Sequence, residues 1–144
     1  MSTLNNKTEN EMAYVSPELK AKLAPTIKAI LKKYNVKGSI AVRNHSTLVL
    51  NVKSAPIDFI ADFNETAKQR YASGDRREAI GHIQVNEYHY KQHFSGKAKQ
   101  FLTEVITAMN DGNFDHSDSQ SDYFCVGWYV NVNIGKWDKN FVVE

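Results

Sequence analysis

The chain contains few residues that could cross-link it or anchor it in a membrane. Its 144 residues include one cysteine, Cys125, so no disulfide can form within the chain. The apolar neighbours of Cys125 indicate a buried structural thiol in a reducing compartment. No apolar run approaches the roughly 18 residues that cross a bilayer, and the polar start MSTLNNKTENEM has no signal-peptide core. These absences exclude a disulfide scaffold and predict a soluble, cytoplasmic protein.

The remaining composition is typical of one globular domain. Hydrophobic residues make up 42% of the chain, charged residues 24% and aromatic residues 11%. A chain of this length suits a single domain with one core. Residues 1–13 are rich in Asn, Thr and Glu and have little to bury, so they are predicted to be a disordered tail. Residues 14–144 are then a single α+β domain.

Charge is divided unevenly along the chain. Residues 17–43 hold seven Lys or Arg and one Glu, a local net charge of +6, whereas residues 104–144 carry a net charge of −5. The total of +2 therefore hides a dipolar molecule. Such a dipole steers encounters with charged partners but says nothing about chemistry.

The hydrophobic period predicts the order of elements. Ser16 and Pro17 mark the start of a basic helix over 17–37, in which Pro25 either makes a kink or begins a second helix. The period then changes to two in SIAVR and TLVLNVK, which predicts a β-hairpin. Helices over 58–72 and 96–110 and two further strands give the order α-β-β-α-β-α-β. We expect a two-layer α+β fold, an antiparallel sheet of about four strands with helices on one face.

The last long strand, in YFCVGWYVNVNIG, points to function. Its alternation places Trp128, Val130, Val132 and Ile134 on one side and Tyr129, Asn131 and Asn133 on the other. If the second row lines an uncovered face, that face is an aromatic, hydrogen-bonding surface suited to recognition, although it could equally be a solvated face with no partner. The predicted binding contacts are Trp128, Tyr129, Asn131, Asn133, Trp137, Arg43, His45 and Asn51.

Three segments carry a resemblance to a known group. VKGSIAVRNHSTLVLNVKSAPIDF (36–59), GNFDHSDSQSDYF and GWYVNVNIGKWDK together resemble uncharacterised phage and mobile-element proteins, with a layout similar to one of the large polyvalent protein-associated domains. The resemblance covers about two-thirds of the chain. It implies an accessory factor carried by mobile DNA that acts on host nucleic-acid or defence machinery in the host cytoplasm, without catalytic residues to transfer.

The basic helix has two interpretations. It could contact phosphates and bind DNA or RNA in a salt-sensitive way, or it could simply be the solvated face of an amphipathic helix. The residues of the nucleic-acid interpretation are Lys20, Lys28, Lys32, Lys33, Lys37 and Arg43.

Three patterns hint at chemistry. His45 and Thr47 resemble half of the two-histidine phosphoesterase signature, but the second copy has Gln84 where Ser or Thr should stand. His89 and His93 have zinc-ligand spacing but no acid between them, and surface histidines are commoner. The aspartates from Asp111 to Asp122 lack the EF-hand pattern. We therefore predict no metal and no cofactor.

The sequence thus favours a non-enzymatic accessory protein of phage or mobile-element type that binds a host protein through a polar, aromatic sheet face and opposed charge patches. A nucleic-acid-binding accessory protein is the alternative. A phosphoesterase acting through His45 and Thr47 is the third hypothesis.

Overall fold

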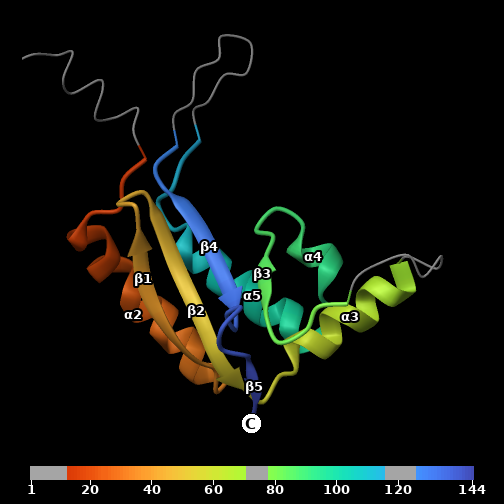
Figure 1. Ribbon diagram of the computed structural model, residues 1–144. Helices are drawn as coiled ribbons and strands as arrows, with labels where there is room; N and C mark the ends of the chain where they lie inside the picture. The colour runs from red at the N-terminus through yellow and green to blue at the C-terminus, as the bar shows by residue number, and fades with distance from the viewer. Residues whose placement is uncertain (1–12, 71–77, 116–125) are drawn as a thin grey trace, which may run out of the picture.

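The protein is an open, mixed sheet of five strands with helices packed against it (Figure 1). The computed structural model describes residues 13–70, 78–115 and 126–144. The predicted tail falls almost entirely outside the described residues, as do Cys125 and most of the acidic loop. The α+β class is confirmed.

Helix α2, Pro17–Lys33, forms as the sequence predicts at its start. The Ser16 Oγ accepts a hydrogen bond of 3.0 Å from the backbone N–H of Leu19, and Pro17 occupies the first turn, where an N–H would have no helical partner. Pro25 lies inside this one helix rather than between two. Its missing N–H leaves the carbonyl of Ala21 without a helical donor, and the exposure of Ala21 lets water replace it.

Strands β1, Lys37–Arg43, and β2, Thr47–Ala55, form the predicted hairpin. The turn places Asn44 at φ 53° and His45 at φ 59°, and the N–H of Ser46 donates to the carbonyl of Arg43 over 3.2 Å. Two successive left-handed residues are the geometry of a type I′ turn, whose twist matches that of the strands it joins.

The prediction of a wholly antiparallel sheet is wrong at its centre. Strand β4, Tyr129–Ile134, pairs with β2 in parallel, with Val132 opposite Leu50. The chain between them forms α3, β3, α4 and α5, a crossover long enough to return the strand in the same direction. The short β3, Ile83–Val85, then pairs with β4 antiparallel, giving the order β1-β2-β4-β3.

Strand β5, Val142–Val143, continues beside β2 where β4 stops. The N–H of Gly135 donates to the carbonyl of Val52, and the N–H of Glu144 donates to that of Ala55. The loop between β4 and β5 therefore leaves and rejoins the same edge of β2.

The helices lie on one face of the sheet, as predicted, with α2 and α5 behind the strands in Figure 1. The other helices are α3, Phe59–Arg70, α4, Tyr90–His93, and α5, Gly96–Met109. Between the layers, Phe59 and Phe101 are fully buried with ring centroids 5.6 Å apart. Among the described residues, no helix has the length and apolar character that a bilayer span requires. The core thus forms on one side of the sheet and leaves the other side free of described helices.

Candidate binding site

We call the side of the sheet away from the helices the open face (Figure 1). Residues that pair in register share a face, so the pairing of Asn51 with Asn133 and of Val49 with Asn131 defines it. Its residues are Ser39, Ala41 and Arg43 on β1, Thr47, Val49, Asn51 and Lys53 on β2, Tyr129, Asn131 and Asn133 on β4, and Gln84 on β3.

The amides at the centre of the open face differ in their bonding. Asn133 Nδ2 donates to Asn51 Oδ1 over 3.1 Å, so these two predicted contacts satisfy each other. Asn131 lies opposite Val49, whose side chain has no polar atom. The Asn131 side chain is 8% exposed, and its Oδ1 is buried with no hydrogen-bond partner among the described residues. An acceptor left without a donor is therefore part of this face.

Two hollows meet at the end of β4 that carries Tyr129. Their volumes are about 410 Å³ and about 480 Å³, and both are lined by Glu87, Tyr88, Tyr129 and Val130. Tyr129 is 47% exposed and Tyr88 80% exposed. The first hollow extends toward Trp128 and Asp115, and the second extends over Asn131 toward Arg43. We call these two hollows together the tyrosine site.

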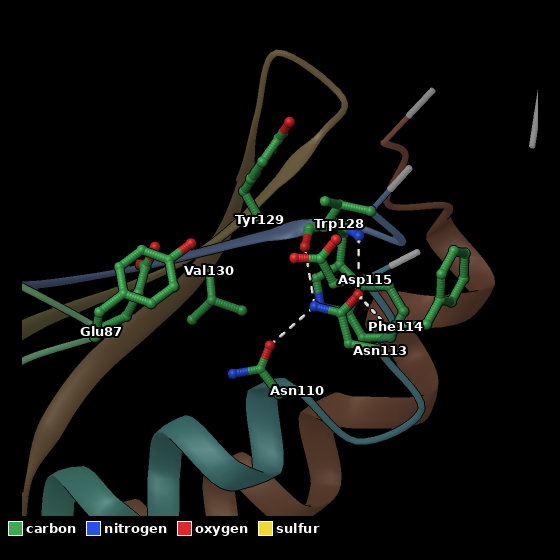
Figure 2. A pocket seen from close by; sticks show the side chains of 10 residues that line it. Glu87, Asn110, Asn113, Phe114, Asp115, Trp128, Tyr129 and Val130 are labelled. Carbon is green, nitrogen blue, oxygen red and sulfur yellow. Dashed lines mark hydrogen bonds between the residues drawn. The ribbon is translucent and has the colours of Figure 1, made fainter. Parts of the chain in front are cut away.

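Asn113 holds one wall of the first hollow (Figure 2). Its Nδ2 donates to Asn110 Oδ1 and to the carbonyl of Trp128, both over 2.9 Å, and its Oδ1 accepts from the N–H of Trp128 over 3.1 Å. A Cβ at Gly127 would lie 2.5 Å from Asn113 Oδ1, so a side chain there would push Asn113 out of these hydrogen bonds. The wall is therefore fixed by backbone contacts.

The charges around the tyrosine site are mainly acidic. Glu87 and Asp115 line the first hollow from either side of Val130 in Figure 2, and its described lining contains no Lys or Arg. Burial raises the pKa of the Glu87 carboxyl, and a hydrogen bond from Tyr88 partly offsets this. Burial and then the charge of Glu87 raise the pKa of the Tyr88 phenol. A half-buried carboxylate in a hollow whose described lining has no cation favours a cationic or hydrogen-donating ligand.

The two tryptophans predicted as contacts lie in different environments. Trp128 is buried on the helix side, where its Nε1 donates to the carbonyl of Met109 over 2.9 Å, and it meets the tyrosine site only as part of the lining of the first hollow. Trp137 is 83% exposed in the loop before β5 and lines a separate hollow of about 390 Å³ beside Asn51 and Asn133. His45 is exposed in the β1–β2 turn.

The basic residues do not form one surface. The lysines of α2 lie on the helix side of the sheet, whereas Arg43 lies on the open face. Lys33 pairs with Glu104 at 2.8 Å and Lys37 with Glu144 at 3.1 Å. The nucleic-acid residues predicted from the sequence are therefore divided between two sides, and two of them have acidic partners.

The residues of the histidine patterns lie in different environments. His45 is exposed, while Thr47 is buried on the open face. The ring of His93 packs edge-on against Phe63, with centroids 5.8 Å apart. No group of three or more His, Cys, Asp or Glu side chains among the described residues could hold a metal, and Asp118 and Asp122 lie outside them.

Sequence reasoning missed Glu87, Tyr88 and Gln84 as site residues. They follow or belong to β3, which has only three residues and places them beside β4. The exposed aromatic Tyr88 in NEYHYKQ was the available signal, but no period links this segment to Tyr129. Only the strand order brings them together.

Comparison of the chain with protein-family models, curated proteins and solved structures gave no match. The function is therefore inferred from the geometry of the open face.

Proposed function

We propose that this protein is a non-enzymatic binding protein that docks on a partner protein through the open face of its sheet. The observation that carries the proposal is the tyrosine site, in which two exposed phenol rings border both hollows and the second hollow is lined by Asn131, whose amide oxygen has no partner among the described residues. Aromatic side chains with a polar edge dominate the energetics of protein interfaces.

The strand that holds Tyr129 and Asn131 favours a binding role. Tyr129 and Asn131 stand on β4, which pairs with β2 at both positions and with β3 only from Val132 onward, so a partner would meet a preorganised surface at low entropic cost. The amide side chains around them bind through hydrogen bonds but do not exchange protons near neutral pH. These amides suit binding better than acid–base catalysis.

The proposal also concerns the kind of genetic element that encodes the protein. The hairpin and β4, which form most of the open face, are the segments that resemble mobile-element proteins. We therefore propose an accessory protein of a phage or mobile element that binds a host protein.

Matched affinity captures from a bacterial lysate test the docking surface. The baits are the wild-type chain, a Tyr88→Ser/Tyr129→Ser variant of the open face and a Lys28→Ser/Lys32→Ser variant of α2. We expect proteins that the wild type and the α2 variant retain and the open-face variant loses, as quantified by mass spectrometry. A set of captured proteins identical for all three baits contradicts docking through the open face.

Nucleic-acid binding through α2 is a second candidate, favoured by the local charge of +6 over residues 17–43. Fluorescence anisotropy with single-stranded and duplex DNA at 50 and 200 mM salt, roughly the range over which phosphate contacts weaken strongly, tests it. A steep loss of affinity with salt that disappears in Lys28→Ser/Lys32→Ser would support this candidate. An affinity that changes neither with salt nor with Lys28→Ser/Lys32→Ser would exclude binding through α2.

A further inference from the structure

The unsatisfied oxygen of Asn131 identifies what the open face lacks. Buried acceptors in folded proteins are nearly always hydrogen-bonded, because an unpaired one costs the free energy of its lost hydration. Asn131 Oδ1 has no donor among the described residues, although the next amide along the same strand, Asn133, is paired with Asn51. The position therefore demands a donor that the described fold does not supply.

The surroundings of Asn131 restrict the chemistry of that donor. Asn131 lines the second hollow together with Glu87, Tyr88 and Tyr129. A carboxylate and an amide oxygen are both acceptors, and phenol rings attract a cation to their faces. A ligand that fits all four groups is cationic, flat enough to lie against a ring and able to donate to two acceptors at once.

We propose that the tyrosine site accepts the guanidinium group of an arginine side chain from the docked partner, which donates to Asn131 Oδ1 and to the Glu87 carboxylate between the rings of Tyr88 and Tyr129. The inference rests on the proposed function, since the arginine belongs to the protein that docks on the open face. A guanidinium is planar and carries five N–H donors, whereas an ammonium is a compact, strongly hydrated point charge.

Arg43 also lines the second hollow and carries the same charge as the proposed ligand. It lies on β1, two strands away from β4, and it is exposed at the rim. Glu87, which follows β3, lines both hollows, and Asp115 lines the first. The partner's arginine therefore enters from the β3 side, and removal of Arg43 should strengthen its binding.

Titration with short peptides tests the inference on the intact chain. The probe is acetyl-Gly-Gly-Arg-Gly-Gly-amide, and its controls replace Arg by citrulline, which has the same shape without charge, or by Lys. We expect saturable NMR shifts of the Asn131 side-chain amide and of both tyrosine rings with the Arg peptide, weaker shifts with Lys and none with citrulline. No saturable shift up to about 50 mM Arg peptide, or equal binding of citrulline, overturns the inference.

Substitutions separate binding from folding. Asn131→Leu keeps the branching and the number of side-chain heavy atoms but removes the acceptor, so it should weaken the Arg peptide about tenfold without loss of stability. Asn131→Asp adds charge to the acceptor and should strengthen binding. Unchanged affinity of the Arg peptide in both variants overturns the role of Asn131. Uridine monophosphate is the second probe, and the same NMR shifts with this nucleotide but not with the Arg peptide overturn the inference as well.

The two proposals can fail separately. If the Arg peptide does not bind but the Tyr88→Ser/Tyr129→Ser variant still loses its lysate partners, the arginine inference is wrong and docking through the open face stands. If this variant retains every captured protein, docking itself is wrong.

Discussion

The two sides of strand β4 differ in what their residues contribute. Val130, Val132 and Ile134 point into the helix layer and are at most 5% exposed. Tyr129 and Asn131 point the other way, where one ring is half exposed and one amide oxygen has no donor in the described part of the chain. One six-residue strand therefore packs one row of side chains against the core and turns the other row, in which Asn133 is paired with Asn51, to the open face. The exposed ring and the oxygen without a described donor are the features on which the proposed binding role rests.

The largest expected effect is a loss of stability from a substitution in the core on the helix side of the sheet. Phe101→Ala removes a fully buried ring that contacts Phe59 and Tyr34, so it should lower the free energy of unfolding by about 3–5 kcal/mol. Urea denaturation followed by circular dichroism measures this. Gln84→Ala on the open face is the control and should change stability by less than about 0.5 kcal/mol. Comparable losses for both variants would remove the distinction between the two faces.

The second effect tests the open face. Tyr129→Ala should weaken partner binding by about 2 kcal/mol or more, because it removes an exposed aromatic anchor of the tyrosine site. Its thermal midpoint should stay close to that of the wild type. Isothermal titration with the captured partner gives the affinity, and Lys28→Ala on α2 is the matched control. A large fall in the thermal midpoint would instead assign Tyr129 to the fold.

A third change sharpens the comparison by altering the turn that joins β1 to β2 without touching either face. His45 adopts φ 59°, a conformation that costs a residue with a side chain about 1 kcal/mol and costs glycine little. His45→Gly should therefore raise the free energy of unfolding by about that amount, as chemical denaturation can measure. His45→Ala keeps the Cβ and should bring no comparable gain. Loss of stability in His45→Gly would show that the imidazole itself stabilises the turn.

The smallest effects come from two glutamates whose pKa values shift in opposite directions. Hydrogen bonds from Lys33 and Tyr34 lower the pKa of Glu104, so its contribution to stability is present above pH 4.5 and is lost as the pH falls through the lowered value. Glu104→Gln should destabilise the protein at pH 7 and have little effect in acid.

Glu87 behaves in the opposite way. Because burial raises its pKa, its favourable contribution is complete below pH 4.5 and is lost as the pH rises through the raised value. Tyr88 donates a hydrogen bond to it, and the other charged or ionisable groups that line the same hollows are Asp115, Tyr129 and Arg43. Glu87→Gln should stabilise the protein at pH 7 but not at pH 4, and unfolding curves of both variants at the two pH values check the signs. The same sign for both glutamates would contradict the contrast.

The sequence predicts much of the fold for identifiable reasons. Ser16 and Pro17 start α2 through local contacts, and Asn44 with His45 suits a tight turn, so these features need no distant partner. The alternation of side chains around Asn131 also predicts which residues of β4 share a face, because successive side chains of a strand point to opposite faces.

The rest depends on contacts between distant segments. The parallel pairing of β2 with β4 follows from a crossover of about 70 residues, which no local pattern encodes. Trp128 illustrates a different difficulty. The alternation of the strand already placed it on the inner side, but its aromatic ring suggested a contact with a partner. Tyr88 and Glu87 reach the site only through β3, whose three residues give no periodic signal.

The loop between β4 and β5 has a consequence for how the molecule can vary. It leaves β2 at Gly135, where a Cβ would lie 2.5 Å from the carbonyl oxygen of Gly81, and returns at Phe141, whose N–H donates to that carbonyl over 2.7 Å. Because both ends are fixed at one place, residues added at the tip beside Trp137 lengthen the loop without shifting the sheet. An epitope or a fluorophore could therefore be inserted at this tip. Related chains could also differ in the length of this loop, and so in how far it extends toward a partner, while the strands stay the same.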